Sequence, residues 1–247
     1  MNFDNQIALI TGGASGMGKA CVQYLQQHGM KVVVWDKQED TTSEAELSLK
    51  CDVTSDKSVE EAMKQTISQL GIPRVCVNCA GIAPAKRIVG KEGPMPLDAF
   101  RQVIDVNLIG TFNVMRIAAH AMSNLELESK SQERGVIINT ASIAAFEGQI
   151  GQAAYSASKG GIVSMTLPAA RELAQLAIRV NTIAPGLIGT PLLLNMPQEV
   201  QDSLIATVTF PKRLGKPEEF AALVGHIIEN GMINGEVIRL DAALRMR

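Results

Sequence analysis

Short apolar runs recur along this chain, and segments with a helical spacing of apolar side chains separate them. Runs rich in Val, Ile and Leu that end at turn residues are typical of buried parallel strands. We predict seven strands, over residues 6–11, 31–35, 47–53, 74–78, 136–140, 178–183 and 236–240. The helical spacing predicts helices over residues 17–28, 55–70, 98–122, 152–176 and 217–229.

Strands and helices alternate from end to end, which favours a single α/β domain over residues 1–247. Crossovers between parallel strands are right-handed, so this order predicts a Rossmann fold: a doubly wound, seven-stranded parallel sheet with helices on both faces. Ligands bind such a sheet at the carboxyl ends of its strands. We take residues 184–212, which are rich in Pro, Leu and Met, as a candidate substrate loop.

Composition narrows the class of protein. Lys and Arg number 23 and Asp and Glu 25, a formal net charge of -2, so no basic excess points to nucleic acid as the partner. No apolar run reaches the ~18 residues that a membrane span needs. Residues 1–5 also lack the basic and apolar parts of a secretion signal. We expect a soluble, cytoplasmic protein that acts on a small molecule.

Four cysteines are present, and two of them form a C-x-x-C motif, Cys76 and Cys79. This spacing occurs in metal and redox sites. Cys76 falls inside an apolar, strand-like run, and no second Cys/His pair accompanies it. We therefore interpret the cysteines as buried small residues and expect no metal.

Glycines cluster between the first predicted strand and the first predicted helix. The run from Thr11 to Gly18 reads T-G-G-A-S-G-M-G. Glycine lets the chain turn tightly and lets backbone N–H groups approach an anion, and the helix that follows adds a favourable dipole. The run therefore predicts a phosphate-binding turn, although glycine also ends strands for purely steric reasons.

An acidic residue, Asp36, ends the second predicted strand, 18 residues after Gly18. A carboxylate at this place accepts hydrogen bonds from ribose hydroxyls and repels a 2′-phosphate. The neighbouring Lys37 weakens the prediction, because its ammonium can partly neutralise a phosphate. We predict NAD rather than NADP as the cofactor.

Tyr155 and Lys159 lie four residues apart on a predicted helix, so they share one face. A nearby ammonium favours the phenolate and makes tyrosine a better base. Such a pair is common on helix surfaces, but two further residues raise its significance. Ser142 follows a predicted strand, and Asn107 lies within a long helix among apolar neighbours.

These motifs together resemble those of the short-chain dehydrogenase/reductase family over essentially the whole chain. The glycine turn is similar to the family's T-G-x-x-x-G-x-G, and Asn107, Ser142, Tyr155 and Lys159 match its catalytic tetrad in order and spacing. The run Asn78-Cys79-Ala80-Gly81 resembles the family's N-N-A-G, with Cys79 in place of the second Asn, and Pro185 to Thr190 match its P-G loop. The resemblance implies an NAD-binding Rossmann domain.

The resemblance also implies a role for each matched residue. Tyr155 would exchange a proton with the substrate oxygen, Ser142 would orient that oxygen, Lys159 would lower the pKa of Tyr155 and hold the nicotinamide ribose, and Asn107 would hold a water. The implied cofactor contacts are Gly12, Ser15, Gly16, Met17, Gly18, Asp36, Asp52, Val53, Asn78, Ala80, Gly81, Tyr155, Lys159, Pro185, Gly186, Ile188 and Thr190.

Within the family, long stretches are similar to the type II 3-hydroxyacyl-CoA dehydrogenases, which overlap with 17β-hydroxysteroid dehydrogenase type 10. These stretches are residues 135–142, 145–149, 151–155, 165–168, 210–215 and 234–241. The resemblance implies oxidation of a short or branched 3-hydroxyacyl-CoA. It also implies substrate contacts from Ser142, Gln152, Tyr155 and Leu192. Leu192, Leu193, Leu194 and Met196 suit either an apolar lid over an acyl chain or the core of a buried loop, and Lys86, Arg87 and Lys91 suit either contacts of a CoA phosphate or solvated loop charges.

Other functions remain open from the sequence. A 3-ketoacyl carrier-protein reductase, a steroid or polyol dehydrogenase, and an NAD-responsive binding protein all fit the fold. The first normally uses NADPH, against which Asp36 argues, and the last has no need of an intact tetrad. Family analogy further suggests a homotetramer.

Overall fold

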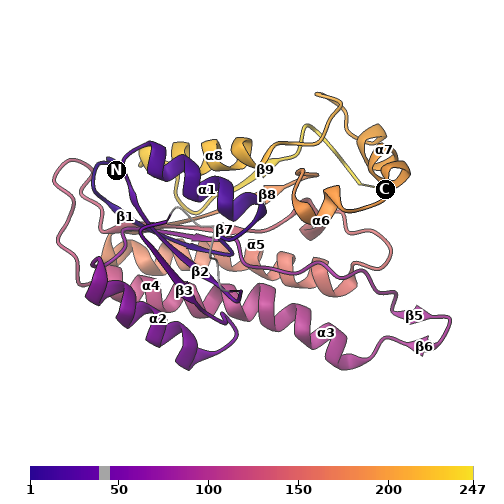
Figure 1. Ribbon diagram of the computed structural model, residues 1–247, viewed down its shortest axis with the longest axis horizontal. Coiled ribbons are helices and arrows are strands. Elements are labelled where there is room, and N and C mark those ends of the chain that lie inside the picture. Colours follow the sequence, from indigo (N-terminus) through magenta and orange to yellow (C-terminus); the bar gives the residue numbers. More distant parts are fainter. Residues whose placement is uncertain (39–44, 247) are drawn as a thin grey trace.

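The computed structural model describes residues 1–38 and 45–246 of the chain, and it has at its centre a seven-stranded parallel sheet (Figure 1). The strand order is β3-β2-β1-β4-β7-β8-β9. The bounds are β1 Ile7–Thr11, β2 Lys31–Asp36, β3 Leu47–Lys50, β4 Val75–Asn78, β7 Gly135–Thr140, β8 Ile178–Pro185 and β9 Val237–Leu240. The predicted doubly wound sheet is confirmed.

The α-helices of the described part of the chain are α1 Gly16–Gln27, α2 Asp56–Gln69, α3 Leu97–Ile104, α4 Gly110–Met122, α5 Ala153–Leu173, α6 Pro191–Leu194, α7 Gln198–Ala206 and α8 Pro217–Glu229. Ser55 caps α2 by accepting a hydrogen bond from the Ser58 N–H at 3.3 Å, and Pro217 opens α8. In the described part of the chain, no helix is long and apolar enough to cross a membrane.

Two apolar cores lie on opposite faces of the sheet. One packs α1 and α8 against side chains such as Ile10 and Val34, and the other packs α2, α4 and α5 against Leu9 and Trp35. Figure 1 shows α1 and α8 above the sheet and α2, α4 and α5 below it. Successive residues of a strand point to opposite faces, so strands covered on both sides must be apolar at nearly every position.

Two predicted segments differ from expectation. The long helix over 98–122 is divided into α3 and α4 by a π-helical segment, Asp105–Ile109. The segment 184–212 is not a bare loop, because it contains α6 and α7. A small hairpin, β5 Val89–Gly90 and β6 Gly93–Pro94, interrupts the connection after β4. Sequence periodicity cannot show such short elements, because they depend on contacts with distant residues.

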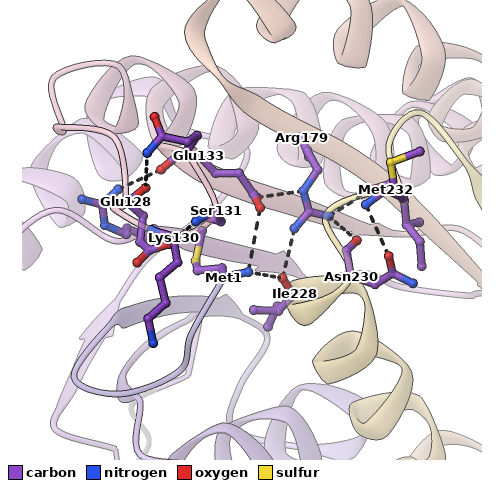
Figure 2. A network of polar contacts seen from close by, with 12 residues as sticks. Met1, Glu128, Lys130, Ser131, Glu133, Arg179, Ile228, Asn230 and Met232 are labelled. Carbon is purple, nitrogen blue, oxygen red and sulfur yellow. Dashed lines mark hydrogen bonds and ion pairs between the residues drawn. The ribbon is translucent and has the colours of Figure 1, made fainter.

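Arg179 on β8 organises a buried polar cluster at the end of the sheet opposite the predicted site (Figure 2). Its guanidinium pairs with Glu133 at 2.8 Å and donates to the carbonyls of Ile227, Ile228 and Ile233 at 2.8, 3.0 and 2.9 Å. These carbonyls end α8 or follow it, so the cation satisfies acceptors that the helix leaves open. The cluster ties together three segments far apart in the sequence.

Candidate active site

The carboxyl ends of β1, β2, β4, β7 and β8 bring the predicted site residues to one edge of the sheet. The strand order reverses between the neighbouring strands β1 and β4. The chain proceeds from β1 toward one edge of the sheet, through β2 and β3, and from β4 toward the other edge, through β7, β8 and β9. A crevice opens at such a switch point, and it is where open α/β sheets bind their ligands. The glycine turn that follows β1 lies at this point.

Close packing explains the glycines of this turn. Gly12 has φ +68°, and a Cβ on it would lie 2.9 Å from the backbone of Ala80. A Cβ on Gly18 would collide with the carbonyl oxygen of Gly12, and one on Gly16 would lie 3.2 Å from Thr190. The Ala80 N–H also donates to the Thr11 hydroxyl at 3.2 Å. The turn therefore contacts both the loop after β4 and the loop after β8, as a shared ligand site requires.

Asp36 ends β2 beside the turn. Its carboxylate accepts hydrogen bonds from the N–H groups of Ala14 at 3.2 Å and Gln38 at 3.1 Å. Lys37 turns away to form an ion pair with Asp52 at 3.0 Å. Hydrogen bonds from Thr54, together with Lys37, hold the pKa of the Asp52 carboxyl below its usual range. Asp52 therefore pairs with the Lys37 ammonium, which is the charge that weakened the prediction of NAD from Asp36.

Two predicted cofactor residues have side chains that serve the fold. The Asn78 amide is buried and donates to Asn139 on the adjacent strand β7 at 2.8 Å. Val53 is buried against Gly110, and its carbonyl accepts a hydrogen bond from Asn113 at 2.9 Å. Any contact of Asn78 with a ligand must therefore come from its backbone.

Lys159 and Tyr155 lie one turn apart on α5, with the Lys159 Nζ 5.8 Å from the centre of the Tyr155 ring. The ammonium is buried and donates to the Thr140 carbonyl at 2.6 Å. Burial lowers the pKa of Lys159 to about 8. In the low-dielectric interior this cation is held by few partners, so it is available to polar groups of a ligand.

Tyr155 and Ser142 are the two hydroxyl-bearing residues of the predicted catalytic tetrad. Burial raises the pKa of Tyr155, and a hydrogen bond with Ser142 opposes the shift. The sequence predicted the opposite direction from Lys159, but the Lys159 ammonium bonds to Thr140 instead. Ser142 follows β7, where its hydroxyl accepts from the Ala144 N–H at 3.1 Å. The phenol is thus a neutral proton donor in the protein alone.

Asn107 occupies the π-helical segment, is fully buried, and has a side chain saturated with protein contacts. Its Oδ1 accepts from the Ile82 N–H at 2.8 Å, and its Nδ2 donates to the Ile82 carbonyl at 2.9 Å and to the Ser158 hydroxyl at 3.0 Å. The Asn107 carbonyl accepts from Thr111 at 2.7 Å. The Asn107 side chain therefore holds the loop after β4 against α5. The predicted water would have to bond to a group other than this side chain.

The segment after β8 closes the far side of the crevice. The Gly186 N–H donates to Leu240 at 2.9 Å, and a Cβ on Gly186 would lie 2.9 Å from Asp241. Ile188 is buried and pairs with Gly215, while Thr190 contacts Gly16. Thr190 thus reaches the glycine turn at Gly16, and Pro185, Gly186 and Ile188 precede it in the same segment.

Of the predicted substrate residues, Gln152 and Tyr155 lie at the amino end of α5, Ser142 follows β7, and Leu192 lies on α6. Gln152 precedes α5, and its side-chain oxygen accepts from the Gln149 N–H at 2.9 Å. Leu192 belongs to α6, but its side chain lies outside the described part of the structure. Leu193 is buried, which removes it from the candidate lid, whereas Leu194 and Met196 are exposed. A pocket of about 580 Å³ opens between the loop at Arg87 and residues 144–156.

Three residues that hydrogen-bond to the predicted site residues were not predicted from the sequence. They are Ile82 and Ser158, which bond to Asn107, and Thr140, whose main-chain carbonyl accepts from Lys159. Main-chain groups leave no signal in the residue type, so Ile82 and Thr140 had none. Ser158 directly precedes Lys159, and its hydroxyl also donates to the Tyr155 carbonyl at 2.7 Å. A small polar residue on the buried side of the helix was the available signal.

Comparisons with known proteins agree with this geometry. The family model described as short chain dehydrogenase matches residues 6–201. The 3-hydroxyacyl-CoA dehydrogenase type-2 of Bos taurus is 53% identical over 250 residues, which cover 98% of this chain and 95% of that protein. The Homo sapiens protein of the same name is 53% identical over 251 residues, with the same coverage.

A solved structure supports the same assignment. The crystal structure of 3-hydroxyacyl-CoA dehydrogenase type-2 from Mycobacterium avium matches with a TM-score of 0.91 at 40% identity, covering 99% of this chain and 98% of that one. The family's name and its oxidoreductase chemistry fit a site that places a phenol, a hydroxyl and an ammonium beside a glycine turn. The chain belongs to the short-chain dehydrogenase family of oxidoreductases.

Proposed function

We propose that this protein is an NAD-dependent dehydrogenase that interconverts a short or branched 3-hydroxyacyl-CoA and its 3-ketoacyl-CoA. The observation that carries the chemistry is the group formed by Tyr155, Ser142 and Lys159 at the carboxyl ends of the strands. The substrate class rests on the relatives from Bos taurus and Homo sapiens, both named 3-hydroxyacyl-CoA dehydrogenase type-2.

The residues around the glycine turn fit a dinucleotide. The turn has no side chains at Gly12, Gly16 and Gly18, because backbone at Gly12 and Gly18 and the Thr190 side chain at Gly16 lie close to the positions that Cβ atoms would take. Asp36 offers its carboxylate at the end of β2, and Lys37 is already paired with Asp52. A carboxylate without a free cation beside it favours a ribose diol over a 2′-phosphate, which supports NAD over NADP. When bound, NAD supplies the acceptor for the hydride that leaves the alcohol carbon.

The protein's own residues handle the proton. Tyr155 donates its phenolic proton to the ketone oxygen in reduction and takes it back in oxidation. Ser142, whose hydroxyl accepts from the Ala144 N–H at 3.1 Å, orients the same oxygen. The Lys159 ammonium stabilises the phenolate form, in which the negative charge develops close to the cation. Asn107 keeps α5 and the loop after β4 in register through Ile82 and Ser158.

Exposed cations near the pocket suit an acyl-CoA. Lys86, Arg87 and Lys91 are exposed on the loop after β4, and Arg87 also lines the pocket of about 580 Å³. A guanidinium or ammonium is a good partner for a phosphate. Gln152 and the segment around Leu192 border the reacting carbon in this proposal, and binding of the remote CoA part would mainly position that carbon.

A homotetramer in the cytoplasm completes the proposal. Large apolar side chains are exposed on the outer surfaces of α3, α4 and α5 and the π-helical segment, namely Leu97, Ile109, Phe112 and Leu167. Such a patch supports subunit contacts. All four cysteines are free thiols, which supports a reducing compartment.

Replacement of Tyr155 by Phe tests the catalytic proposal. We expect Tyr155→Phe to lower the reduction of acetoacetyl-CoA by NADH at least about 1,000-fold while NADH binding, followed by fluorescence titration, stays within about three-fold. The chain has one other tyrosine, Tyr24 on α1, so Tyr24→Phe is the matched control and should keep its activity. Substantial turnover by Tyr155→Phe would contradict the mechanism. Tight NADH binding by the wild type without reduction of any ketone would favour a binding protein instead.

A further inference from the structure

The end of β9 and the chain that follows it, residues 239–246, contact both ends of the candidate substrate loop, and we call this stretch the C-terminal segment. At the start of the loop, the Gly186 N–H donates to the Leu240 carbonyl at 2.9 Å. Near its end, the Thr209 hydroxyl donates to the Ala243 carbonyl at 3.2 Å. Figure 1 shows the C-terminal segment, in yellow, passing from β9 toward α6 and α7, which belong to the loop.

The strongest contacts of the C-terminal segment go to the residues that follow β7. The Arg239 guanidinium donates to both carboxylate oxygens of Glu147, at 3.0 and 3.1 Å. Its Nε donates to Asp241 at 2.6 Å, and its Cζ lies 5.2 Å from the centre of the Phe146 ring. The side chains of Arg239 and Glu147 are each only 22% exposed. A two-bond pair with this degree of burial fixes geometry far better than a single exposed ion pair.

A second arginine completes the cluster. Arg245 lies 3.4 Å from the Glu147 carboxylate and donates to Asp241 at 3.1 Å. The Met246 N–H donates to Glu147 at 3.2 Å. Each of the two carboxylates therefore contacts both guanidiniums, and the four charges balance.

The backbone of the C-terminal segment is strained where it turns. Ala242 and Ala243 have φ +51° and +60°, a left-handed conformation that costs free energy in any residue with a Cβ. Asp241 holds the turn, because its carboxylate accepts from the Ala243 N–H at 3.1 Å and its carbonyl accepts from the Leu244 N–H at 2.9 Å. Such conformations persist only where the surroundings determine them, and they are concentrated at functional sites.

A short, fully bonded turn connects this cluster to Ser142. The Ser142 hydroxyl caps the 3-10 turn Ile143–Ala145, and the Phe146 and Glu147 N–H groups both donate to the Ile143 carbonyl, at 2.9 and 3.0 Å. Phe146 also lines the pocket of about 580 Å³. A shift of Glu147 therefore moves both the Ser142 hydroxyl and one wall of the pocket.

From these contacts we propose that Arg239 is a positioning residue for the reaction: through Glu147 and Phe146 it fixes the turn that carries Ser142 and the pocket wall beside it. The proposal rests on the proposed function, in which Ser142 orients the substrate oxygen. Arg239 does not touch the reacting atoms. Its effect is on the binding and orientation of the ketone, whereas the glycine turn that holds the dinucleotide is built without it.

Steady-state kinetics of acetoacetyl-CoA reduction test the effect on the site. We expect Arg239→Met to raise the KM for acetoacetyl-CoA at least about ten-fold, while the Kd of NADH stays within about three-fold. Arg239→Lys keeps the charge but loses the two-bond geometry, so it should share the defect. Glu147→Gln should also share it, and the double variant Arg239→Met/Glu147→Gln should be no worse than the single variants, because both act through one contact. An unchanged KM in Arg239→Met, or fully additive effects, would overturn the proposal.

Amide hydrogen exchange tests the positioning without any substrate. The N–H groups of residues 144–147 all donate within the turn after Ser142. We expect them to exchange at least about five-fold faster in Arg239→Met than in the wild type. Arg101→Met, which removes an exposed ion pair on α3, is the control and should match the wild type in exchange and in KM.

The two readouts separate this proposal from the proposed function. Unchanged exchange at residues 144–147 in Arg239→Met would overturn the positioning role whatever the substrate of the enzyme. A wild type that does not reduce acetoacetyl-CoA, together with faster exchange in the variant, would contradict the proposed function and still support the hold of Arg239 on the turn.

Discussion

The side-chain amide of Asn107 closes a pair of hydrogen bonds on the main chain of Ile82, one to its N–H at 2.8 Å and one to its carbonyl at 2.9 Å. An amide matches an exposed peptide in this way because it has both a donor and an acceptor. The third bond, to Ser158, connects the same side chain to the helix of Tyr155 and Lys159. Asn107 is thereby a positioning residue between the loop after β4 and α5.

Removal of this clamp should cost both stability and turnover. Asn107→Ala leaves the buried groups of Ile82 and Ser158 without their partner, and each such loss costs about 1–3 kcal/mol. We expect the free energy of unfolding in urea to fall by about 2–4 kcal/mol, with kcat falling more than KM changes. Asn124→Ala, an exposed asparagine at the end of α4, is the control and should stay within about 0.5 kcal/mol. Equal stability of the two variants would contradict the clamp.

The buried ammonium of Lys159 predicts a pH-dependent stability. Its pKa is lowered from 10.5 to about 8 by burial, so between these values the unfolded chain holds a proton that the folded chain has released. The free energy of unfolding must then rise with pH across this window, and the gain is lost as the pH falls through 8. We expect the wild type to gain about 2 kcal/mol relative to Lys159→Met between pH 7.5 and 9.5, measured by urea denaturation. Parallel curves for the two proteins would refute this.

Arg179 should be far more important for stability than an exposed arginine. Arg179→Met breaks the 2.8 Å ion pair with Glu133, whose remaining cation is the Met1 ammonium at 3.8 Å, and removes a donor from the carbonyls of Ile227, Ile228 and Ile233. Breaking a buried pair in this way costs about 3–5 kcal/mol. The exposed pair of Arg101 and Asp98 on α3 offers the matched control, Arg101→Met, for which a loss below about 0.5 kcal/mol is expected. Chemical denaturation of both variants decides between a structural cluster and an incidental contact.

Asp36 should set the choice of cofactor. We expect Asp36→Ala to lower the ratio of kcat/KM with NAD to kcat/KM with NADP at least about ten-fold, which corresponds to about 1.4 kcal/mol. The ratio should fall because the carboxylate that repels a 2′-phosphate is gone. Asp98→Ala removes an exposed carboxylate on α3 and should leave the ratio unchanged. If Asp36→Ala keeps the ratio of the wild type, the preference has another source.

Local pattern was enough for the sheet and for the order of the site residues. The inner strands of the sheet are buried on both faces, so a continuous apolar run such as that within Lys31–Asp36 identifies a strand without knowledge of its neighbours. The glycine turn is equally local, because its conformation and its packing exclude larger side chains at Gly12 and Gly18. The spacing of Tyr155 and Lys159 follows from the helical repeat alone.

Contacts between distant segments decided the rest. The π-helical segment at Asn107, the carbonyl of Thr140 that holds Lys159, and the burial that raises the pKa of Tyr155 all depend on which elements pack together. The same is true of Cys79, which forms a C-x-x-C motif with Cys76 in the sequence but packs on the opposite face of the sheet from it. Residue type determines what a side chain can donate, accept or ionise, whereas desolvation and partners arise only when the chain folds, because both are properties of neighbours far away in the sequence.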